Sequence, residues 1–223
     1  MRGKIAEVFD SVQGEGIYLG EKQIFVRFFG CNLNCKFCDT KLNHFIEYEP
    51  NELFEKIKLY QGEFHSISFT GGEPLLQKDY LKEVLKLTSK HGYKNYLETN
   101  GTLPSELADV IDYLDIVAMD VKLPSSTGMC NLLDLHREFL KIATKKVVFL
   151  KTIICQSTQE EDLREALALI KEVHMDATLV LQPNSYENDE RLVEKLATFR
   201  DICIEEGVLT CVIPQMHKIA GIR

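Results

Sequence analysis

Three cysteines, Cys31, Cys35 and Cys38, lie within eight consecutive residues and follow the mostly apolar run 24–30. A loop this short can bring three thiolates to one compact inorganic centre, and thiolates are ligands that suit iron–sulfur clusters and zinc. Three thiolates leave one iron of a four-iron cluster without a protein ligand, so that iron could bind a small molecule. Zinc with His44 as the fourth ligand is the alternative, but structural zinc usually takes two ligand pairs, and no second Cys/His pair is close. The spacing favours the cluster.

A second motif, Thr70-Gly71-Gly72-Glu73-Pro74, follows the apolar stretch 67–69. Two glycines let a backbone approach a ligand without a side chain in the way. Glu73 can accept a hydrogen bond from an ammonium group. The motif is separated from the cysteines by one expected helix and one expected strand, which favours a shared site.

The cysteine motif resembles the signature of the radical S-adenosylmethionine (radical SAM) enzymes. In that family the C-x3-C-x2-C loop holds a [4Fe-4S] cluster, whose fourth iron is chelated by the amino and carboxylate groups of S-adenosylmethionine. Electron transfer from the cluster then gives a 5′-deoxyadenosyl radical. Phe37 matches the aromatic residue that usually precedes the third cysteine in those enzymes.

Further motifs resemble one branch of that family, the 7-carboxy-7-deazaguanine synthases on the route to queuosine and related deazapurines. They are segment 9–16, with Ser11 and Gln13-Gly14-Glu15-Gly16, then Cys38-Asp39-Thr40, and later in the chain 181–183 and 214–218. Segment 120–126 is a looser match. The resemblance implies a lyase that converts 6-carboxy-5,6,7,8-tetrahydropterin to 7-carboxy-7-deazaguanine with loss of ammonia. It also implies Mg2+, a homodimer, and an external one-electron donor of the flavodoxin or ferredoxin type.

The resemblance further implies which residues form the site. The cluster ligands would be Cys31, Cys35 and Cys38, and Mg2+ would bind Thr40. S-adenosylmethionine would be bound by Phe37, Cys38, Asp39, Gly72, Glu73, Asp120, Val121, Lys122, Gln182, Pro183, Asn184 and Ser185. The pterin would be bound by Val12, Gln13, Gly14, Glu15, Arg27, Thr70 and His217.

Several of these residues have plain alternatives. The guanidinium of Arg27 suits a carboxylate, but Arg27 could also be an ordinary surface residue at the end of a strand. Thr40 could only cap a turn. Segment 10–16 could be a surface turn, and His217 could face solvent. One departure from the family concerns the end of the chain, 219–223, because many relatives carry an aromatic, Asn-rich tail there; the role of Arg223 is open.

Two rival functions follow from the same residues. A glycyl-radical-enzyme activase also carries C-x3-C-x2-C, but it acts on a protein and does not account for Gln13-Gly14-Glu15-Gly16. A zinc-stabilised binding module is the rival that is not an enzyme.

Composition bounds the remaining possibilities. The 223 residues suit one domain, 1–223, and 45% apolar content is ordinary for a globular protein. The net charge of −8 without a Lys/Arg block gives no sign of nucleic-acid binding. No signal-peptide apolar segment and no run of about 20 apolar residues is present, so we expect no membrane span. Seven cysteines, an odd number, favour a reducing cytoplasm. We expect most of Cys130, Cys155, Cys203 and Cys211 to be small buried residues.

Expected strands and helices alternate along the chain, and they must position these motifs. Expected strands are 5–9, 23–29, 66–69, 93–97, 115–121, 147–154, 179–182 and 208–213. Expected helices are about 50–60, 80–88, 107–114, 132–143, about 158–173 and 188–205, with Thr158 and Glu161 as a capping box. Such alternation predicts parallel β/α units, in a partial barrel or a doubly wound sheet. The family resemblance implies the first: an α/β fold that is a radical-SAM-type partial (β/α)6 barrel with modified N- and C-terminal segments.

Overall fold

One sheet organises the computed structural model, which describes residues 1–40, 42–187 and 189–222. Its strand order is β3-β1-β2-β4-β5-β6-β7-β8-β9. The strands are β1 (Gly3–Val12), β2 (Lys22–Phe28), β3 (Ile46–Tyr48), β4 (Ser66–Gly71), β5 (Asn95–Thr99), β6 (Ile116–Asp120), β7 (Val147–Ile154), β8 (Leu179–Pro183) and β9 (Thr210–Val212). The helices are α1 (Pro50–Ile57), α2 (Lys78–Lys90), α3 (Pro104–Val110), α4 (Pro124–Thr127), α5 (Leu133–Ala143), α6 (Glu160–Val173), α7 (Glu190–Glu205) and α8 (Met216–Ala220). Short 3-10 turns are η1 (Gly16–Tyr18), η2 (Pro74–Gln77) and η3 (Ile111–Tyr113).

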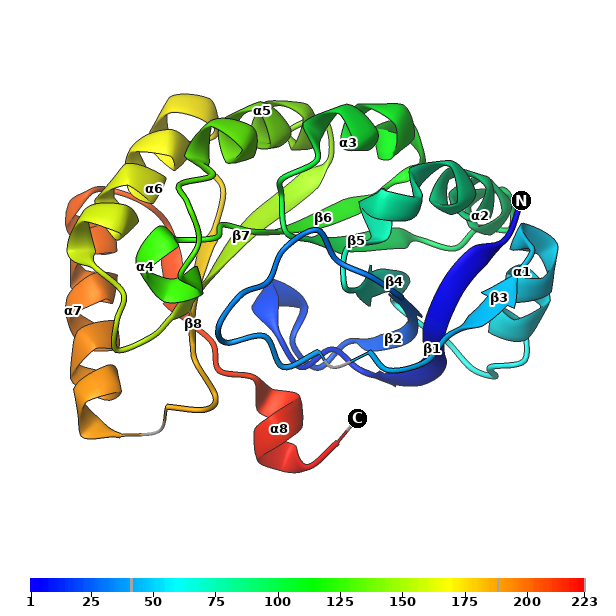
Figure 1. Cartoon of the computed structure of the whole chain (residues 1–223), viewed down its shortest axis with the longest axis horizontal. Helices are drawn as coiled ribbons and strands as arrows, with labels where there is room; N and C mark the ends of the chain where they lie inside the picture. The colour runs from blue at the N-terminus through cyan, green and yellow to red at the C-terminus, as the bar shows by residue number, and fades with distance from the viewer. Residues whose placement is uncertain (41, 188, 223) are drawn as a thin grey trace.

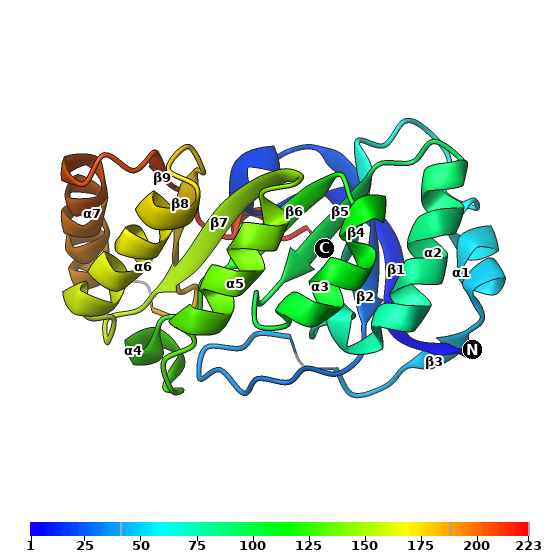
Figure 2. The ribbon, with the colours of Figure 1, turned by 90° about the horizontal axis from the view of Figure 1, so that it is seen from above.

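Strands β2 and β4 to β9 pair in parallel, whereas β1 pairs antiparallel with both β2 and β3. Figure 1 shows the sheet curved, with the long helices on its outer side and two loops and α8 on its inner side. Seen from above, α1, α2, α3, α5 and α6 lie in a row along that outer face (Figure 2). Because β3 and β9 are the two ends of the strand order, the described sheet stays open. This confirms the expected partial barrel.

The core lies between the strands and the outer helices. On α2, the side chains of Leu81, Val84 and Leu85 recur at helical spacing and are fully buried. They join the same apolar cluster as Phe28 of β2 and Phe69 of β4. Burying an aliphatic or aromatic side chain of this size stabilises the fold by about 1.5–3 kcal/mol. The amphipathic pattern of the outer helices therefore explains why they cover one face of the sheet only.

The inner face of the sheet is filled at one end by the segment that follows β1. Gly16 adopts a positive φ of 68°, and a side chain there would collide with the ring of Phe149. Tyr18 packs against Phe149 and against Tyr96, with ring centroids 6.2 and 5.9 Å apart. Segment 13–18 is therefore an internal plug of the partial barrel, and the alternative of a surface turn is wrong.

Several local predictions differ from the structure. Thr158 does not cap α6: its hydroxyl accepts from the N–H of Cys155 at 2.7 Å, and Gln159 precedes the helix instead. Helix α7 begins after Asp189, which accepts from Leu192 N at 3.1 Å, and the predicted start at Asn188 lies outside the described residues. Elements β3, α4 and α8 have three to five residues each, too few for a periodic signal.

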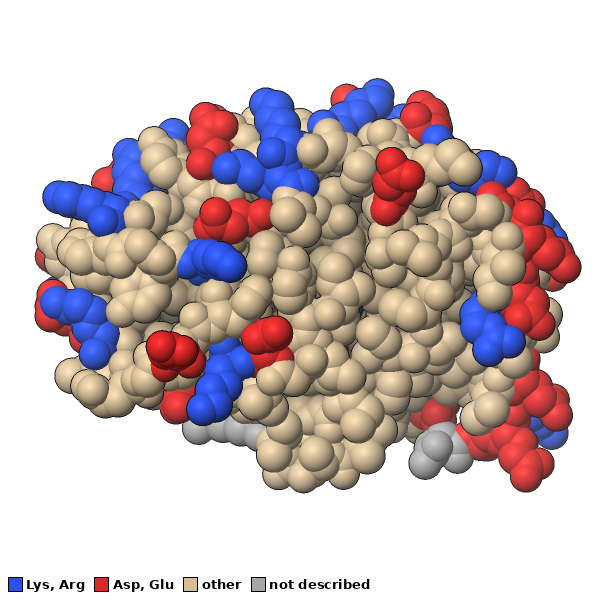
Figure 3. Space-filling model, turned by 180° about the vertical axis from the view of Figure 1, so that it is seen from behind, with Lys and Arg blue, Asp and Glu red and all other residues tan. Residues whose placement is uncertain are grey.

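Charged side chains of both signs are interspersed around an uncharged area on the face seen in Figure 3. Charged side chains of the outer helices also form exposed ion pairs, as Arg164 of α6 does with Glu160 in the same helix and with Glu206 at the end of α7. Exposed pairs of this kind contribute little stability, about 0–1 kcal/mol each. Within the described ranges, no helix has both the length and the apolar character that crossing a membrane requires.

Candidate active site

A cavity of about 690 Å3 opens on the inner face, at the carboxyl ends of the parallel strands. Each of six neighbouring strands contributes a polar side chain to its wall: Arg27 (β2), Thr70 (β4), Glu98 (β5), Asp120 (β6), Lys151 (β7) and Gln182 (β8). The carboxyl ends of parallel strands are where α/β folds bind ligands, because loops and side chains converge there. The cysteine loop and the plug segment complete the wall.

The cysteine loop contains no regular element and is held by contacts from outside. Asn32 donates from Nδ2 to Thr102 Oγ1 at 2.9 Å and accepts from Asn100 Nδ2 at 2.8 Å. At the middle of the loop, the N–H of Lys36 donates to the carbonyl of Thr127 at 3.1 Å. The loop is thereby pinned to the ends of β5 and α4, and its three cysteines face the same cavity.

Among the described residues, no group of three or more His, Cys, Asp or Glu side chains converges on a single metal-ion position. A four-iron cluster makes a different demand, because its three cysteines bind three separate irons. Burial raises the pKa of the Cys35 thiol, and the neighbouring Lys122 ammonium opposes this. His44 is exposed and does not line the cavity, so it takes no part in the wall that the cysteines share.

The glycines of the Thr70-Gly71-Gly72 motif serve the chain itself. A Cβ on Gly72 would lie 1.9 Å from the carbonyl oxygen of Gly30, and one on Gly71 would lie 2.3 Å from that of Phe28. Gly71 also has a φ of 123°, which side chains rarely adopt. The N–H of Gly72 donates to Phe28 O at 3.1 Å. These glycines bring the end of β4 against the base of the cysteine loop, and Gly72 also lines the cavity.

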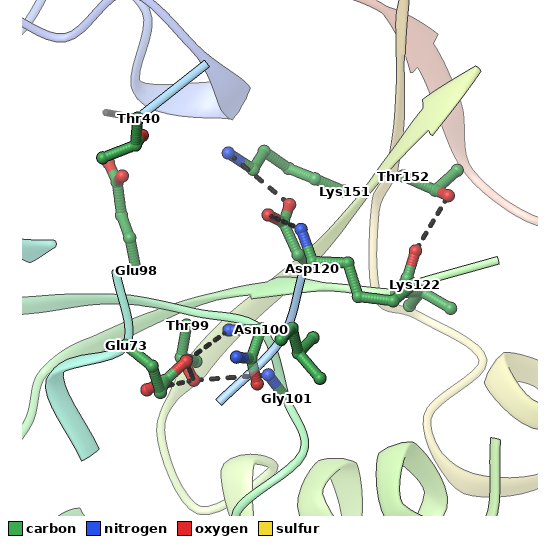
Figure 4. Close-up of polar contacts among 12 residues, drawn as sticks. Thr40, Glu73, Glu98, Thr99, Asn100, Gly101, Asp120, Lys122, Lys151 and Thr152 are labelled. Atoms are coloured by element: carbon green, nitrogen blue, oxygen red, sulfur yellow. Dashed lines mark hydrogen bonds and ion pairs between the residues drawn. The ribbon is translucent and has the colours of Figure 1, made fainter. Parts of the chain in front are cut away.

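Glu73 lies beneath the cavity, fully buried, and not in its wall. Its carboxylate accepts from Leu75 N at 3.1 Å, Thr99 Oγ1 at 3.0 Å and Asn100 N at 2.8 Å. Burial raises the pKa of Glu73 to about 7, and these hydrogen bonds offset only part of that rise. Glu73 thus joins η2 to the end of β5. Figure 4 shows its carboxylate beside Thr99 and Asn100.

Four charged side chains alternate in sign across the cavity wall. Lys151 Nζ lies 2.6 Å from Glu15 Oε2 and 3.5 Å from Asp120 Oδ1. Lys122 Nζ lies 2.8 Å from Asp120 Oδ2 and also above the ring of Phe37, 5.6 Å from its centroid. Figure 4 shows both ammonium groups directed at Asp120. The row Glu15–Lys151–Asp120–Lys122 connects the plug segment to β7 and to the end of β6.

The pKa values in this row follow from burial and charge together. Burial alone would lower the pKa of Lys151, but Asp120, Glu15 and Glu98 outweigh it and hold the pKa well above its ordinary value. Burial alone would raise the pKa of Asp120, yet the two ammonium groups keep it below its usual range. All members of the row are therefore charged at neutral pH.

A second chain of polar groups crosses the inner face beside the charged row. Gln13 Nε2 donates to Glu98 Oε1 at 2.8 Å and to Gln23 Oε1 at 2.9 Å. Glu98 also accepts from Thr70 Oγ1 at 2.8 Å, through its other oxygen. Gln13 and Thr70 are thus both held by one carboxylate that the sequence motifs did not single out.

Arg27 lies partly exposed in the wall, at the end of β2. Its Nε is 3.5 Å from Glu7 Oε2, and its guanidinium lies 5.7 Å from the centroid of the Phe9 ring. The antiparallel register of β1 and β2 puts Glu7 directly opposite Arg27. The guanidinium is therefore held at the cavity, neither buried nor free in solvent.

A short strap, residues 214–218, contributes Gln215, His217 and Lys218 to the wall of the cavity. Gln215 Nε2 donates to Glu15 Oε1 at 2.7 Å and to Asp39 Oδ2 at 3.0 Å. Lys218 forms an ion pair with Asp39 and donates to Ser185 Oγ at 2.7 Å. His217 packs on Gly14, where a Cβ would come within 2.4 Å of Nδ1. The strap joins the plug segment, the cysteine loop and the end of β8.

Most residues predicted for the site share the one cavity. Its wall contains Val12, Gln13, Gly14, Glu15, Arg27, Cys31, Cys35, Phe37, Cys38, Asp39, Thr40, Thr70, Gly72, Asp120, Lys122, Gln182, Asn184 and His217. Four predicted residues are not in the wall: Glu73, Val121, Pro183 and Ser185. Val121 is buried in the core, and Arg223, whose role the sequence leaves open, lies outside the described residues. Residues of the wall that the sequence did not identify as site residues include Glu98, Asn100, Lys151, Gln215 and Lys218.

Two oxygen atoms of the wall are buried without a hydrogen-bond partner, Oε1 of Gln182 and Oδ1 of Asp120. The second still lies 3.5 Å from the Lys151 ammonium. Buried polar atoms without a partner cost about 1–3 kcal/mol unless a ligand or water satisfies them. Both residues therefore offer acceptors to a ligand that carries N–H or O–H groups.

Known proteins resemble this chain over nearly its whole length. The sequence profile of the Radical SAM superfamily matches residues 25–196. A protein of Geobacter sulfurreducens is 33% identical, over 98% of this chain and 97% of its own. A protein of Methanothermobacter thermautotrophicus is 34% identical, over 100% and 99%. Both are named 7-carboxy-7-deazaguanine synthase.

Solved structures show the same fold. QueE from Escherichia coli superimposes with a TM-score of 0.68 at 21% identity, covering 95% of this chain and 94% of that one. SuiB of Streptococcus suis bound to S-adenosylmethionine gives a TM-score of 0.59 at 16% identity, covering 82% and 48%.

The close approach at Gly72 generates a prediction. Gly72→Ala puts a methyl group against Gly30 O and Cys31 N, so the base of the cysteine loop must move. We expect a loss of about 1–3 kcal/mol in unfolding free energy and a clearly lower iron content after anaerobic reconstitution. Denaturant unfolding and iron analysis measure the two effects. Gly92→Ala is the control: it strains a positive φ in open space, so it should cost stability and leave iron content unchanged. Full iron content in Gly72→Ala would contradict the inference that the close approach at Gly72 positions the cysteine loop for iron binding.

Proposed function

The chain belongs to the radical SAM superfamily and, within it, to the 7-carboxy-7-deazaguanine synthases, and we propose that it converts 6-carboxy-5,6,7,8-tetrahydropterin to 7-carboxy-7-deazaguanine with loss of ammonia. The observation that carries the proposal is one cavity that joins three cysteines to a carboxylate, an amide and a guanidinium, those of Glu98, Gln13 and Arg27. In this proposal the protein is a carbon–nitrogen lyase of deazapurine biosynthesis.

Membership of the superfamily implies a [4Fe-4S] cluster and S-adenosylmethionine. When bound, the two would supply radical chemistry, the abstraction of a hydrogen atom from the substrate. The residues present suit both: Cys31, Cys35 and Cys38 would hold the cluster. The unpartnered Oε1 of Gln182 and the carboxylate of Asp120, which is also paired with Lys122 and Lys151, could accept from the N–H and O–H groups of S-adenosylmethionine. Phe37, Asp39, Gly72, Lys122 and Asn184 complete this part of the wall. Glu73, Val121, Pro183 and Ser185 would support it from outside the wall.

The substrate side of the cavity suits a flat heterocycle with a carboxylate. A pterin edge offers adjacent N–H donors, which Glu98 can accept as it accepts from Gln13 and Thr70. The main chain at Val12 and Gly14, with Glu15 and His217, would border the ring. Arg27 would bind the substrate carboxylate through two parallel N–H···O bonds, because guanidinium and carboxylate are geometrically matched.

A Mg2+ ion at Thr40 is part of the proposal. The hydroxyl of Thr40 lines the cavity and donates to Asp39 Oδ1 at 3.3 Å. A neutral hydroxyl is a weak ligand, and Mg2+ usually combines one or two protein oxygens with waters and substrate oxygens. Thr40 and the substrate carboxylate would then hold the ion together, which would orient the pterin.

Partners and compartment follow from the family resemblance and the composition. We propose a homodimer that works in the cytoplasm and receives single electrons from a flavodoxin- or ferredoxin-type protein. The seven cysteines, which are all free in the structure, suit a reducing compartment.

The rival activase is disfavoured by the relatives, since the two described above are named 7-carboxy-7-deazaguanine synthase. The rival zinc module does not account for the row of charges and amides beside the cysteines.

Turnover of the carboxy-tetrahydropterin, without any protein substrate, is the experiment that tests the function. Reconstituted protein with S-adenosylmethionine and a reductant should release 7-carboxy-7-deazaguanine and ammonia, both followed by chromatography and mass spectrometry. Cys38→Ala should abolish cluster binding and turnover while the fold persists, because a thiolate holds the centre. Cys203→Ala, in the core, serves as the control. Absence of product from protein with a full cluster would refute the function.

Replacing Arg27 tests the carboxylate contact. Arg27→Lys keeps the positive charge but loses the planar fork, so the pterin KM should rise about tenfold, equivalent to about 1.4 kcal/mol. Cleavage of S-adenosylmethionine without substrate should stay unchanged. Arg2→Lys, on the surface beside Glu49 and Glu52, is the matched control. An unaltered KM in Arg27→Lys would remove this residue from the substrate site.

Thr40→Val tests the Mg2+ site, since it keeps the shape and deletes the oxygen. We expect turnover to become slower and independent of Mg2+, with substrate-free cleavage of S-adenosylmethionine intact. Thr40→Ser keeps the hydroxyl and should keep the Mg2+ response. Turnover of the valine variant that still responds to Mg2+ as the native protein does would assign Thr40 to the turn alone.

A further inference from the structure

Asn100, just after β5, has every one of its polar groups engaged. Its N–H donates to Glu73 Oε2 at 2.8 Å, and its carbonyl lies 3.2 Å from His136 Nε2. Its side-chain oxygen accepts from the N–H of Thr102 at 3.1 Å and from the Thr102 hydroxyl at 2.6 Å. The residue is almost fully buried, and Figure 4 shows it beside Glu73 and Thr99. Four contacts with three residues, Glu73, His136 and Thr102, therefore hold Asn100 in place.

The remaining group, the side-chain amide N–H2, faces the cysteine loop. One contact is to Asn32 Oδ1 at 2.8 Å, and the other is to the sulfur of Cys31 at 3.8 Å. Because Thr102 presents two donors to the oxygen of the amide, its nitrogen must be the atom on the Cys31 side. The N–H of Leu33 also lies 3.4 Å from the same sulfur. Cys31 thus has one donor from its own loop, Leu33, and one from the residue that follows β5, Asn100.

We propose that Asn100 is a positioning residue that raises the reduction potential of the cluster through its N–H···S bond to Cys31. The proposal rests on the proposed function, since it requires Cys31 to be a cluster ligand. Hydrogen bonds to ligand sulfurs are among the factors that set the potential of iron–sulfur clusters. One-electron reduction adds negative charge to the cluster and its thiolates. A donor directed at sulfur stabilises the reduced form more than the oxidised form, so it makes reduction easier.

The rigidity of Asn100 strengthens the effect. A donor that is already held in place does not have to reorganise when the electron arrives, so its full stabilisation is available. The two main-chain contacts, to Glu73 and His136, do not involve the Asn100 side chain. A substitution of the side chain therefore removes the donor to sulfur and leaves these two contacts in place.

Asn100→Leu is the variant that tests the proposal, because leucine has a similar shape and no donor. The readout is the midpoint potential of the reconstituted cluster, followed by electron paramagnetic resonance during an anaerobic titration with a low-potential chemical reductant. We expect a shift of about 59 mV to more negative potential, a tenfold change in the one-electron equilibrium. Iron and sulfide content are measured on the same samples. A cluster of full content with an unchanged or more positive potential overturns the proposal.

Asn34→Leu is the matched control: the same substitution at an exposed position of the same loop, which should leave the potential unchanged. If Asn100→Leu does not retain its cluster, the midpoint potential of the Thr102→Val variant tests the proposal instead. That variant deletes the hydroxyl that fixes the amide, so a smaller negative shift supports the proposal and no shift overturns it. A native protein that holds no four-iron cluster would refute the proposed function. A native protein with a full cluster whose potential does not depend on Asn100 would refute this further inference alone.

Discussion

The buried ammonium of Lys151 constrains the architecture of the whole inner face. An unpaired charge at that depth would cost several kcal/mol, so its carboxylate partners have to be present for the fold to be stable. One partner, Asp120, comes from the adjacent strand, but Glu15 is 136 residues away in sequence and reaches Lys151 only if segment 13–18 enters the barrel. The ion pair therefore couples the antiparallel N-terminal hairpin to the parallel strands. It also fixes the side of the cavity on which Gln13 and Glu98 meet.

The rest of the cavity is assembled with few regular backbone contacts. The cysteine loop has no helix or strand, and single groups hold it: the amides of Asn32 and Asn100, the N–H of Lys36 and the carboxylate of Asp39. Glycines at 71 and 72 allow the next strand to approach the base of the loop. A loop held in this way leaves the thiols of Cys31 and Cys38 exposed.

Apolar periodicity is a local signal, and it predicted the strands other than β3 and the outer helices. The family resemblance, carried by short motifs, implied most of the residues that line the cavity. Both missed Glu98 and Lys151, which lie in strands whose neighbours are apolar or β-branched, so no local pattern distinguishes them. Glycines 71 and 72 were interpreted as an approach to a ligand, and the structure adds a tight approach to the chain's own backbone. The prediction that Thr158 caps α6 is wrong because its hydroxyl accepts from the N–H of Cys155, a contact that depends on the turn before the helix. What could not be predicted are contacts between distant segments.

The bridge made by Gln215 has a consequence for the order in which the site is built during translation. Its two acceptors, Glu15 and Asp39, precede it by 200 and 176 residues, so both leave the ribosome long before the strap exists. At typical elongation rates of about 5–20 residues per second, that interval lasts roughly ten seconds or more. Glu15 of the plug segment and Asp39 beside the cysteine loop therefore cannot be bridged by Gln215 until the last residues of the chain have been made.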